Sequence, residues 1–500
     1  MERKYGNKWG IALKLALAVL VGAGLWIVGA PRQASADAKS APGVAAGGQS
    51  SFALLADDAL MVWGRNEMQQ LGGVTTDEQV LSPTMHYLED VQSVHAGRRH
   101  TLVVMKDGRL LGFGANYNSQ LGYPYSFTYM TVAAIVPGLD DVKAAAAGVN
   151  FSMALKGDET VWVWGYNPFF PQLADGVAIN PDGTLSAGQH TPEQVPGLAN
   201  IKAIAAGDNY AGAIDENGDL YMWGDNEFGQ LGTGDNNPRP TPVKVAFGIK
   251  SVAVSDNHTV AVKVDGTVIA FGKNEMGQLG DGTNAPSNLP VNVIGLTDIK
   301  EVALGDDHSL ALGENGQVYA WGSNYQGRLG NGTASPSATP INLIGLNNVV
   351  AIAAGFAHSM AMTGDGHVYS WGFNDKGQLG NGTTDDQYSP VMVIDYGPPS
   401  TPTELNVRRT ILDLGKANLS WQPSPEPDIE YYTIYMRKQG EPAFFTSFRI
   451  YGGATTYTVS GIQQSKTYEF KIEAVDTSGF KSPQSDIVIL EGLNIRKLKS

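Results

Sequence analysis

Residues 271–280 read Phe-Gly-Lys-Asn-Glu-Met-Gly-Gln-Leu-Gly, and variants of this segment occur seven times along the chain. Each copy begins with Trp or Phe followed by Gly, has Asn at its fourth position, and follows the previous copy by 48–59 residues. The leading aromatic residues are Trp63, Phe113, Trp164, Trp223, Phe271, Trp321 and Trp371. Repetition at a nearly constant interval indicates a fold built from structural repeats.

A second element, of the general form Ala-Gly-x-x-His-Ser/Thr, precedes each copy of the first and repeats in step with it. Between the two elements lie stretches that alternate in polarity, such as residues 259–264, and turn pairs such as Asp265-Gly266. Such pairs favour β-hairpins, because both central residues of the turn need positive φ. Each unit therefore predicts about four short antiparallel strands, and seven units predict a seven-bladed β-propeller.

The ends of the array are expected to close the ring together. The chain enters the repeat at the element around Gly47 and leaves it at residues 390–394, which form the strand expected to precede that element. The first and last segments are therefore predicted to share one blade, which would leave no exposed sheet edge at the closure.

The two linked motifs, in register over residues 44–394, resemble the regulator-of-chromosome-condensation (RCC1) repeat family, in a secreted bacterial form. The resemblance implies a seven-bladed RCC1-like β-propeller, a fold that hosts several functions. Kelch repeats share the period and are the alternative fold, although their marker residues are placed differently.

Residues 397–402 read Gly-Pro-Pro-Ser-Thr-Pro, which predicts a linker, and the repeat stops there. The order of Trp421, residues 432–435, Ile462 and Tyr468 beyond it resembles a fibronectin type III domain. That resemblance implies a β-sandwich with a buried Trp421 and with Tyr468 as a corner tyrosine bonded to the main chain. The predicted organisation is a signal peptide over residues 1–36, the propeller over residues 37–396 and the type III domain over residues 397–500.

The N-terminus has the pattern of a targeting segment. Four basic residues within residues 1–14 precede an apolar run over residues 15–30 and the small residues Ala34-Ser35-Ala36. This predicts a signal peptide cleaved after Ala36, and hence a secreted or cell-wall-associated protein. The alternative is an uncleaved anchor, because residues 11–30 are long enough to span a bilayer.

Composition excludes several classes of protein. The 500 residues contain no Cys, which excludes disulfides, thiolate zinc sites, iron–sulfur clusters and cysteine nucleophiles. The formal net charge is -15. Nucleic acids and anionic membrane surfaces require cationic faces, so neither is expected as a partner of the bulk protein.

The histidines give the first candidates for chemistry. One repeat position holds His100, His258, His308 and His358, and the other three units place Ser50, Phe151 and Tyr210 there. A position that accepts such different residues predicts packing or hydrogen bonding between blades. No zinc constellation, calcium loop, phosphate loop or nucleophile elbow is recognisable, so neither a metal nor a cofactor is expected.

The two residues before the His position are expected to lie in loops on one rim of the propeller. These loops carry opposite charges in different units, namely Arg98 and Arg99 in one and Asp208, Asp256, Asp306 and Asp307 in three others. The segregation predicts a dipolar docking face for a partner of complementary charge or for a second copy of the chain. A merely solvated rim is the alternative.

Two adjacent units depart from the repeat with aromatic residues. The second unit carries Tyr123, Tyr125, Phe127 and Tyr129, and the third carries Phe169 and Phe170 between two prolines. Because the loops are equivalent, these rings are expected to lie side by side as a stiff aromatic strip for a protein or a sugar ring. The alternative is that the rings fold over one another and fill two irregular blades.

The interpretation is a secreted, non-enzymatic scaffold that docks a protein or a cell-wall glycan with one propeller face. The rival hypothesis is a secreted polysaccharide hydrolase or lyase with carboxylates in the propeller channel. A carboxylate pair there with raised pKa values would favour this rival. The nuclear protein that names the resembled family is a guanine nucleotide exchange factor, and that activity is not expected of an exported chain.

Overall fold

The computed structural model describes ten segments of the chain, and the architecture of these segments is all-β. They are residues 43–55, 59–123, 128–166, 189–394, 399–410, 413–424, 429–441, 446–451, 453–476 and 481–493. Within them the one helical turn is η1 (Tyr325–Gly327), and no helix is long and apolar enough to cross a bilayer. Their strands form seven four-stranded sheets and the two sheets of a β-sandwich, which confirms the expected fold class.

Each blade consists of four consecutive antiparallel strands. Blades one to four contain β1 (Gly43–Ala46), β2 (Ser50–Leu54), β3 (Leu60–Arg65), β4 (Gln79–His86), β5 (Val91–Ala96), β6 (His100–Met105), β7 (Leu110–Ala115), β8 (Tyr129–Ile135), β9 (Val142–Ala147), β10 (Phe151–Lys156), β11 (Val161–Gly165), β12 (Gln189–Gln194), β13 (Ile201–Ala206), β14 (Tyr210–Asp215), β15 (Leu220–Gly224) and β16 (Arg239–Ala246). Blades five to seven contain β17 (Ile249–Val254), β18 (His258–Lys263), β19 (Val268–Gly272), β20 (Ser287–Asn292), β21 (Ile299–Leu304), β22 (His308–Gly313), β23 (Val318–Gly322), β24 (Ser337–Asn342), β25 (Val349–Ala354), β26 (His358–Thr363), β27 (Val368–Gly372) and β28 (Gln387–Ile394).

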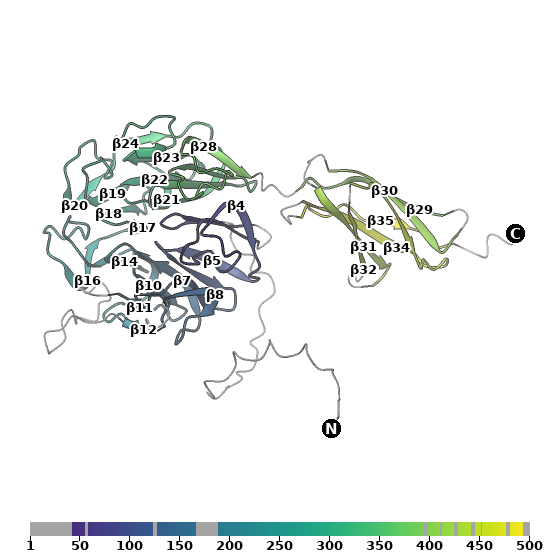
Figure 1. The fold of residues 1–500 in the computed structure, drawn as a ribbon, viewed down its shortest axis with the longest axis horizontal. Helices are drawn as coiled ribbons and strands as arrows, with labels where there is room; N and C mark the ends of the chain where they lie inside the picture. Colours follow the sequence, from purple (N-terminus) through teal and green to yellow (C-terminus); the bar gives the residue numbers. More distant parts are fainter. Residues whose placement is uncertain are drawn as a thin grey trace, which may run out of the picture. The chain divides into compact units, whose positions relative to one another are not determined.

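The blades are arranged around a central axis, with their first strands innermost and their fourth strands at the periphery. In Figure 1, β17 and β21 lie near the centre of the ring and β20 and β24 lie at its edge. The two middle strands of each blade are buried on both faces, as in β6 and β22, because each sheet packs against a neighbouring blade on either side. The core is therefore a ring of apolar layers between blades rather than one central cluster.

The ring does not close in the way that the sequence predicts. β1 belongs to blade one and β28 to blade seven, so no blade is shared between the two ends of the array. The closure is instead made by packing of β1 against β25 and by hydrogen bonds such as that from the Ser51 hydroxyl to the Gln378 carbonyl, at 2.7 Å. Residues 43–46 form the strand that precedes Gly47, and residues 390–394, which the sequence analysis assigned to that place, belong to the fourth strand of blade seven.

The repeated Trp or Phe fills the space between adjacent blades. All seven aromatic side chains are fully buried. The Trp321 indole N–H donates to the carbonyl of Gln278 in the preceding blade at 2.8 Å, and Trp371 donates in the same way to Arg328 at 3.0 Å. The tryptophan at this repeated position, which we call the tryptophan slot, therefore adds a directional hydrogen bond between blades to the apolar contact.

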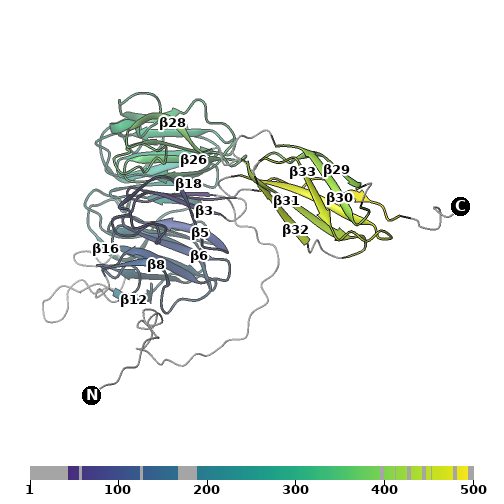
Figure 2. The same cartoon turned by 45° about the vertical axis from the view of Figure 1, so that its right-hand side comes forward.

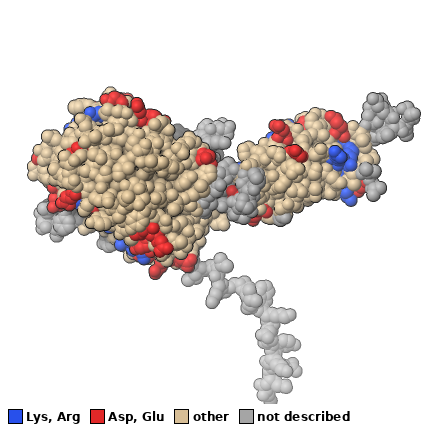
Figure 3. Space-filling model, turned by 90° about the horizontal axis from the view of Figure 1, so that it is seen from above, with Lys and Arg blue, Asp and Glu red and all other residues tan. Residues whose placement is uncertain are grey.

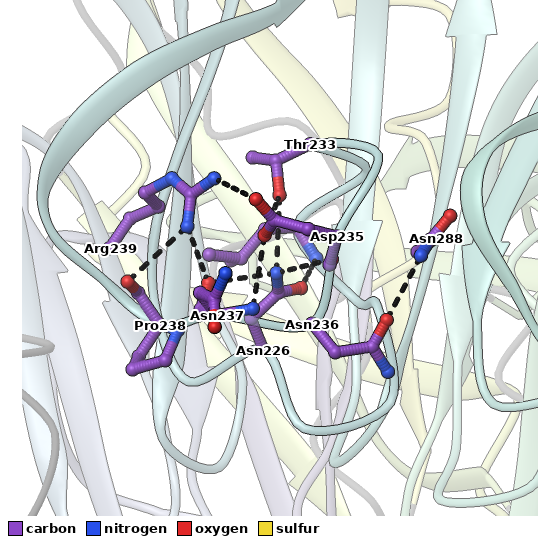
Figure 4. A network of polar contacts seen from close by, with 9 residues as sticks. Asn226, Thr233, Asp235, Asn236, Asn237, Pro238, Arg239 and Asn288 are labelled. Carbon is purple, nitrogen blue, oxygen red and sulfur yellow. Dashed lines mark hydrogen bonds and ion pairs between the residues drawn. The ribbon is translucent and has the colours of Figure 1, made fainter.

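The repeated Asn organises the loop between the third and fourth strands of a blade. The Asn274 side-chain oxygen accepts the Leu279 N–H at 2.9 Å, and its amide donates to the carbonyls of Thr283 and Ala285 at 3.1 and 2.9 Å. Figure 4 shows the corresponding network around Asn226, which an ion pair between Asp235 and Arg239 supports. One buried amide therefore holds both ends of a long loop, which explains why Asn recurs.

The C-terminal unit is a β-sandwich whose two sheets are seen in Figure 2. Its strands are β29 (Thr403–Arg409), β30 (Lys416–Gln422), β31 (Ile429–Lys438), β32 (Thr446–Tyr451), β33 (Thr456–Ser460), β34 (Tyr468–Asp476) and β35 (Val488–Leu490). Trp421 is buried against Tyr432, with ring centroids 5.4 Å apart. The Tyr468 hydroxyl accepts the Gln463 N–H at 3.1 Å, which confirms the corner tyrosine.

Candidate functional site

A cavity of about 220 Å³ lies where the loops after the first strands of the blades converge. Glycines and alanines at the ends of these strands form most of its wall, and Arg98, Asp256, Asp306 and Phe356 contribute larger side chains to it. The predicted rim loops therefore meet at one place, and we call this space the axial pocket.

Six glycines and Ser255, one residue from each blade, form a collar around the axial pocket. A Cβ atom on any of the six collar glycines would lie 2.3–2.5 Å from a carbonyl oxygen of the next blade, which is too close for a side chain. The N–H groups that follow them continue the ring, as Arg98 donates to the Gly148 carbonyl at 3.3 Å and Asp208 to the Ser255 carbonyl at 3.2 Å. The collar glycines are Gly47, Gly97, Gly148, Gly207, Gly305 and Gly355. Close approach of the backbones fixes the radius of the pocket.

Two carboxyl groups from adjacent blades meet in the axial pocket. Asp256 and Asp306 lie within hydrogen-bond reach of each other. Burial, reinforced by the Asp256 charge, raises the pKa of Asp306 to about 9, and burial also raises the pKa of Asp256. Two carboxylates at such short range cannot both ionise readily, so the pair holds a proton near neutral pH.

Asp208 and Arg98 complete the electrostatics of the axial pocket. Burial and the Asp256 charge raise the pKa of Asp208 to about 6. The Arg98 charge opposes the rise in pKa at Asp208, Asp256 and Asp306, so it interacts with all three carboxyl groups. The charges are therefore less separated than the sequence predicts. None of these three carboxyl groups forms an ion pair with a basic residue that the structure describes.

The other charged rim residues have neighbours of their own. Asp307 pairs with Lys273 at 3.2 Å, which leaves its carboxylate neutralised by the preceding blade. Arg99 lines a smaller cavity of about 110 Å³ together with Arg65, Arg98 and Phe356. The Arg98 guanidinium carbon lies 5.4 Å from the centre of the Phe356 ring. A basic subsite therefore adjoins the acidic pocket.

Beyond the axial pocket, the surface of the propeller carries further charge. Figure 3 shows acidic side chains in several patches on the visible side, with fewer basic ones among them. This agrees with the formal net charge of -15.

The four histidines of the repeat link neighbouring blades. The His308 Nε2 lies 3.0 Å from the Ser359 hydroxyl, which itself donates to the Arg328 carbonyl at 2.9 Å. The hydroxyl has one hydrogen, so the imidazole must donate from Nε2, which leaves Nδ1 unprotonated. Burial lowers the pKa of His100 and His358 to about 3. These neutral rings are structural, as the sequence predicts.

Ser255 stands in blade five where the other blades have the collar glycine, and it changes the hydrogen bonding of His258 in the same blade. The Ser255 hydroxyl lies 2.7 Å from Nδ1 of His258, so it supplies that nitrogen with a hydrogen bond. In the other three units Nδ1 of His100, His308 and His358 is buried without a hydrogen-bond partner. The sequence shows that Ser255 departs from the repeat, but only the structure shows that its hydroxyl bonds to His258.

The predicted aromatic strip is only partly described. Tyr125, Phe127, Phe169 and Phe170 lie outside the described residues. Tyr123 packs against the blade core, and its hydroxyl donates to the Ile135 carbonyl, so this ring belongs in part to the fold. Tyr129 is 46% exposed at the start of β8.

Sequence reasoning missed Phe356 and Ser255 as residues of the pocket wall. Ser255 breaks the glycine pattern of its repeat position, which is the signal that would have found it, whereas the position of Phe356 varies from unit to unit and carries no such signal. Among the described residues, no group of three or more His, Asp or Glu side chains is placed to hold a metal ion.

Taken together, these features define a seven-bladed propeller with an axial collar, followed by a β-sandwich. Three family models match the chain: the RCC1-like domain over residues 172–409, the RCC1 repeat over residues 91–120 and the fibronectin type III domain over residues 400–490. The chain therefore carries an RCC1-like propeller and a C-terminal fibronectin type III domain.

Solved structures support the fold. Human WBSCR16 aligns with a TM-score of 0.61 at 25% identity, over 70% of this chain and 97% of that one. Prp20p from Saccharomyces cerevisiae aligns with a TM-score of 0.59 at 26% identity, over 67% of this chain and 85% of that one. The Prp20p structure is described together with binding to Gsp1p and histones.

Curated relatives match over shorter stretches. The secretion-regulating guanine nucleotide exchange factor of Bos taurus is 29% identical over 38% of this chain and 41% of its own length. The ultraviolet-B receptor UVR8 of Arabidopsis thaliana is 30% identical over 40% of this chain and 45% of its own. The chain thus spans less than half the length of these two relatives.

Proposed function

We propose that this chain is an exported, non-enzymatic scaffold that binds a protein partner at the axial pocket and its basic subsite. The observation that carries the proposal is that Asp256 and Asp306 line the axial pocket without an ion-paired base, with the Asp208 charge close enough to act on Asp256 and with Arg98 and Arg99 beside them. Half-buried carboxyl groups that no basic side chain contacts in a direct ion pair favour a ligand that brings a cation. The partner is therefore expected to present a basic group to the pocket and an acidic group to the arginines.

A protein is a better candidate for the partner than a glycan. Prp20p is described as binding proteins, and it shares the propeller fold. The axial pocket, at about 220 Å³, is smaller than the ~300–1,000 Å³ typical of sites that enclose small molecules. A side chain from a protein surface fits such a volume.

The test begins with a pull-down from culture medium and cell-wall extract, with the purified chain as bait. Association of the recovered partner is then measured at low salt for Asp256→Asn with Asp306→Asn, and for Arg98→Glu with Arg99→Glu. Both double variants should associate more slowly, because electrostatic steering acts mainly on the association rate. Asp265→Asn, which removes a charge from an exposed hairpin between β18 and β19, is the matched control. Unchanged rates in both double variants would refute the proposed site.

Export is part of the proposal and has its own test. Residues 1–42 lie outside the described part of the chain, and the proposal rests on the sequence pattern alone. Mass spectrometry of the secreted protein should give Asp37 as its first residue. An intact N-terminus in the membrane fraction would support the anchor instead.

The aromatic residues of the second and third units are a secondary part of the same proposal. Phe169→Ala with Phe170→Ala should weaken binding of the recovered partner without changing the melting temperature. A large fall in melting temperature with unchanged affinity per folded molecule would assign these rings to the fold.

The hydrolase hypothesis is the second candidate, and the Asp256–Asp306 pair is the observation that favours it. Carboxyl groups that cleave glycosidic bonds stand ~5–9.5 Å apart, whereas these two are within hydrogen-bond reach. Incubation with cell-wall polysaccharides, followed by measurement of new reducing ends, tests this candidate. Activity that disappears in the Asp256→Asn and Asp306→Asn variants would establish it.

A further inference from the structure

The outermost strand of blade two, β8, differs from the outermost strands of all other blades. In every blade, a bulge interrupts the pairing of the fourth strand with the third strand at the same position. In six of the seven blades, the residue just before this pairing resumes is Pro. These prolines are Pro83, Pro192, Pro242, Pro290, Pro340 and Pro390. β8 has Ala133 at this position.

The missing proline leaves an N–H group on the outer edge of the sheet. Val136 donates to the Leu110 carbonyl across the β7–β8 ladder at 2.8 Å. Because backbone groups of an antiparallel strand point alternately to its two sides, the N–H groups of Ile135 and Ala133 point away from β7. Proline at an edge removes such a donor and thereby blocks pairing with a foreign strand.

β8 also lacks a clamp that other outer strands have. In four blades, a glycine N–H from the preceding blade donates to a carbonyl of the outer strand at 2.8–2.9 Å. The donors are Gly234, Gly282, Gly332 and Gly382, and the acceptors are Asn288, Ala338, Tyr388 and Leu81. At Thr131 of β8 this bond is not formed between described residues, and Val74 replaces the donor glycine.

The side chains of β8 are apolar and exposed. Tyr129, Val132 and Ile135 expose 46%, 62% and 48% of their surfaces. Residues 128–136 contain no charged side chain. The strand lies on the outer wall of the propeller in Figures 1 and 2. An edge that is apolar, uncharged and free of proline is a template for strand addition.

We propose that β8 pairs edge to edge with β8 of a second copy of this chain. A two-fold interface requires one surface that complements itself. β8 meets this requirement, because an antiparallel copy offers the same outward N–H groups of Ala133 and Ile135, the same outward C=O of Ala133 and no like charges, while the Ile135 C=O accepts the Tyr123 hydroxyl. In the two-fold arrangement Ala133 lies opposite Ala133 of the second copy.

The contact is small, which sets the concentrations for the test. Seven residues of strand extend over about 24 Å, and the area that one such pair buries falls below the ~1,200–2,000 Å² of stable interfaces. The dimer should therefore be weak and should form with rising concentration.

The experiment is sedimentation velocity of the purified chain from about 1 to 200 μM, a range that brackets weak association. Ala133→Pro removes the outward N–H and is expected to fold, since six blades already carry Pro there. Val132→Lys places a charge at the pairing edge. Both variants should weaken dimerisation at least about tenfold. Leu289→Lys, at the equivalent position beside Pro290 in blade five, is the control and should dimerise like the parent chain.

Hydrogen exchange supplies a second measurement on the same samples. The amides of Ala133 and Ile135 should become protected as the parent chain dimerises. A parent chain that stays monomeric throughout overturns the proposal, and capture of an unrelated strand by that monomer would make a foreign peptide the occupant. Equal dimerisation of the Ala133→Pro and Val132→Lys variants overturns it as well, because another surface then joins the copies.

Discussion

A single hydroxyl distinguishes blade five at the level of individual residues. Ser255 supplies Nδ1 of His258 with a hydrogen bond at 2.7 Å, whereas the corresponding nitrogen of His308 is buried without a partner. Three blades therefore keep a buried histidine Nδ1 without a hydrogen-bond donor, and blade five supplies that donor. The difference offers an internal comparison for the cost of a buried polar atom.

We predict that Ser255→Ala destabilises the propeller by about 1–3 kcal/mol, the cost of leaving a buried hydrogen-bonding group unsatisfied. Urea unfolding measures the change. Ser335→Ala, in an exposed loop, is the control and should lie within about 0.5 kcal/mol of the parent chain. Equal stability of the two variants would show that His258 finds another partner.

The tryptophan slot makes a second prediction at this scale. Trp321→Ala and Trp371→Ala should each cost about 3–5 kcal/mol, because both side chains are fully buried. Trp321→Phe should cost only about 1 kcal/mol, because Phe113 and Phe271 occupy the same slot. The Gln278 carbonyl would still accept the Ser309 hydroxyl in that variant. If urea unfolding shows that both alanine variants lose less than about 1 kcal/mol of unfolding free energy, the tryptophan slot is not part of the core.

At the scale of elements, the loop between the third and fourth strands depends on one amide. Asn274 joins Leu279 at one end of the loop to Thr283 and Ala285 at the other. The same arrangement of three hydrogen bonds occurs around Asn324. The loop contacts the next blade, so its order is tied to that of the ring.

We predict that Asn274→Asp destabilises the chain at neutral pH by about 2–3 kcal/mol, since a carboxylate loses the donor and faces two carbonyl oxygens. Because a protonated carboxyl can donate, the loss should shrink as pH falls below the range in which Asp ionises. Asn274→Ala loses both functions and should show no such recovery. Thermal melts at several pH values, each compared with the parent chain, distinguish the two variants.

The sequence predicts individual strands and loops better than it predicts which residues of different blades come into contact. The blade count follows from Trp, Asn and turn residues, because each acts within its own unit. The closure was predicted wrongly because residues 390–394 were assigned to the strand before Gly47, whereas they pair with β27 in blade seven. The approach of Asp256 and Asp306 depends on how two blades turn about the axis, which no spacing along the chain encodes. Both aspartates were recognisable as rim residues, but their pairing was not.

For the whole molecule, the axial pocket makes stability depend on pH. Asp306 and Asp208 have pKa values raised to about 9 and about 6 in the folded chain, from an ordinary value of 3.8. Between the ordinary and the raised pKa, the folded state binds more protons than the unfolded state. Stability of the propeller therefore falls as pH rises through this range.

We predict that Asp306→Asn stabilises the propeller at pH 8 and flattens the fall in stability between pH 5 and pH 8. Each pH unit over which the folded state holds one extra proton corresponds to about 1.4 kcal/mol, so removal of the carboxyl should give a gain of at least that size. Asp281→Asn is the control, because Asn331 and Asn381 stand at the equivalent position and the change removes one charge from a loop. Chemical unfolding at each pH measures the slopes. If the Asp306→Asn variant keeps the slope of the parent chain, the proton is not shared in the axial pocket, and the unpaired carboxyls lose their part in the proposed docking of a basic group.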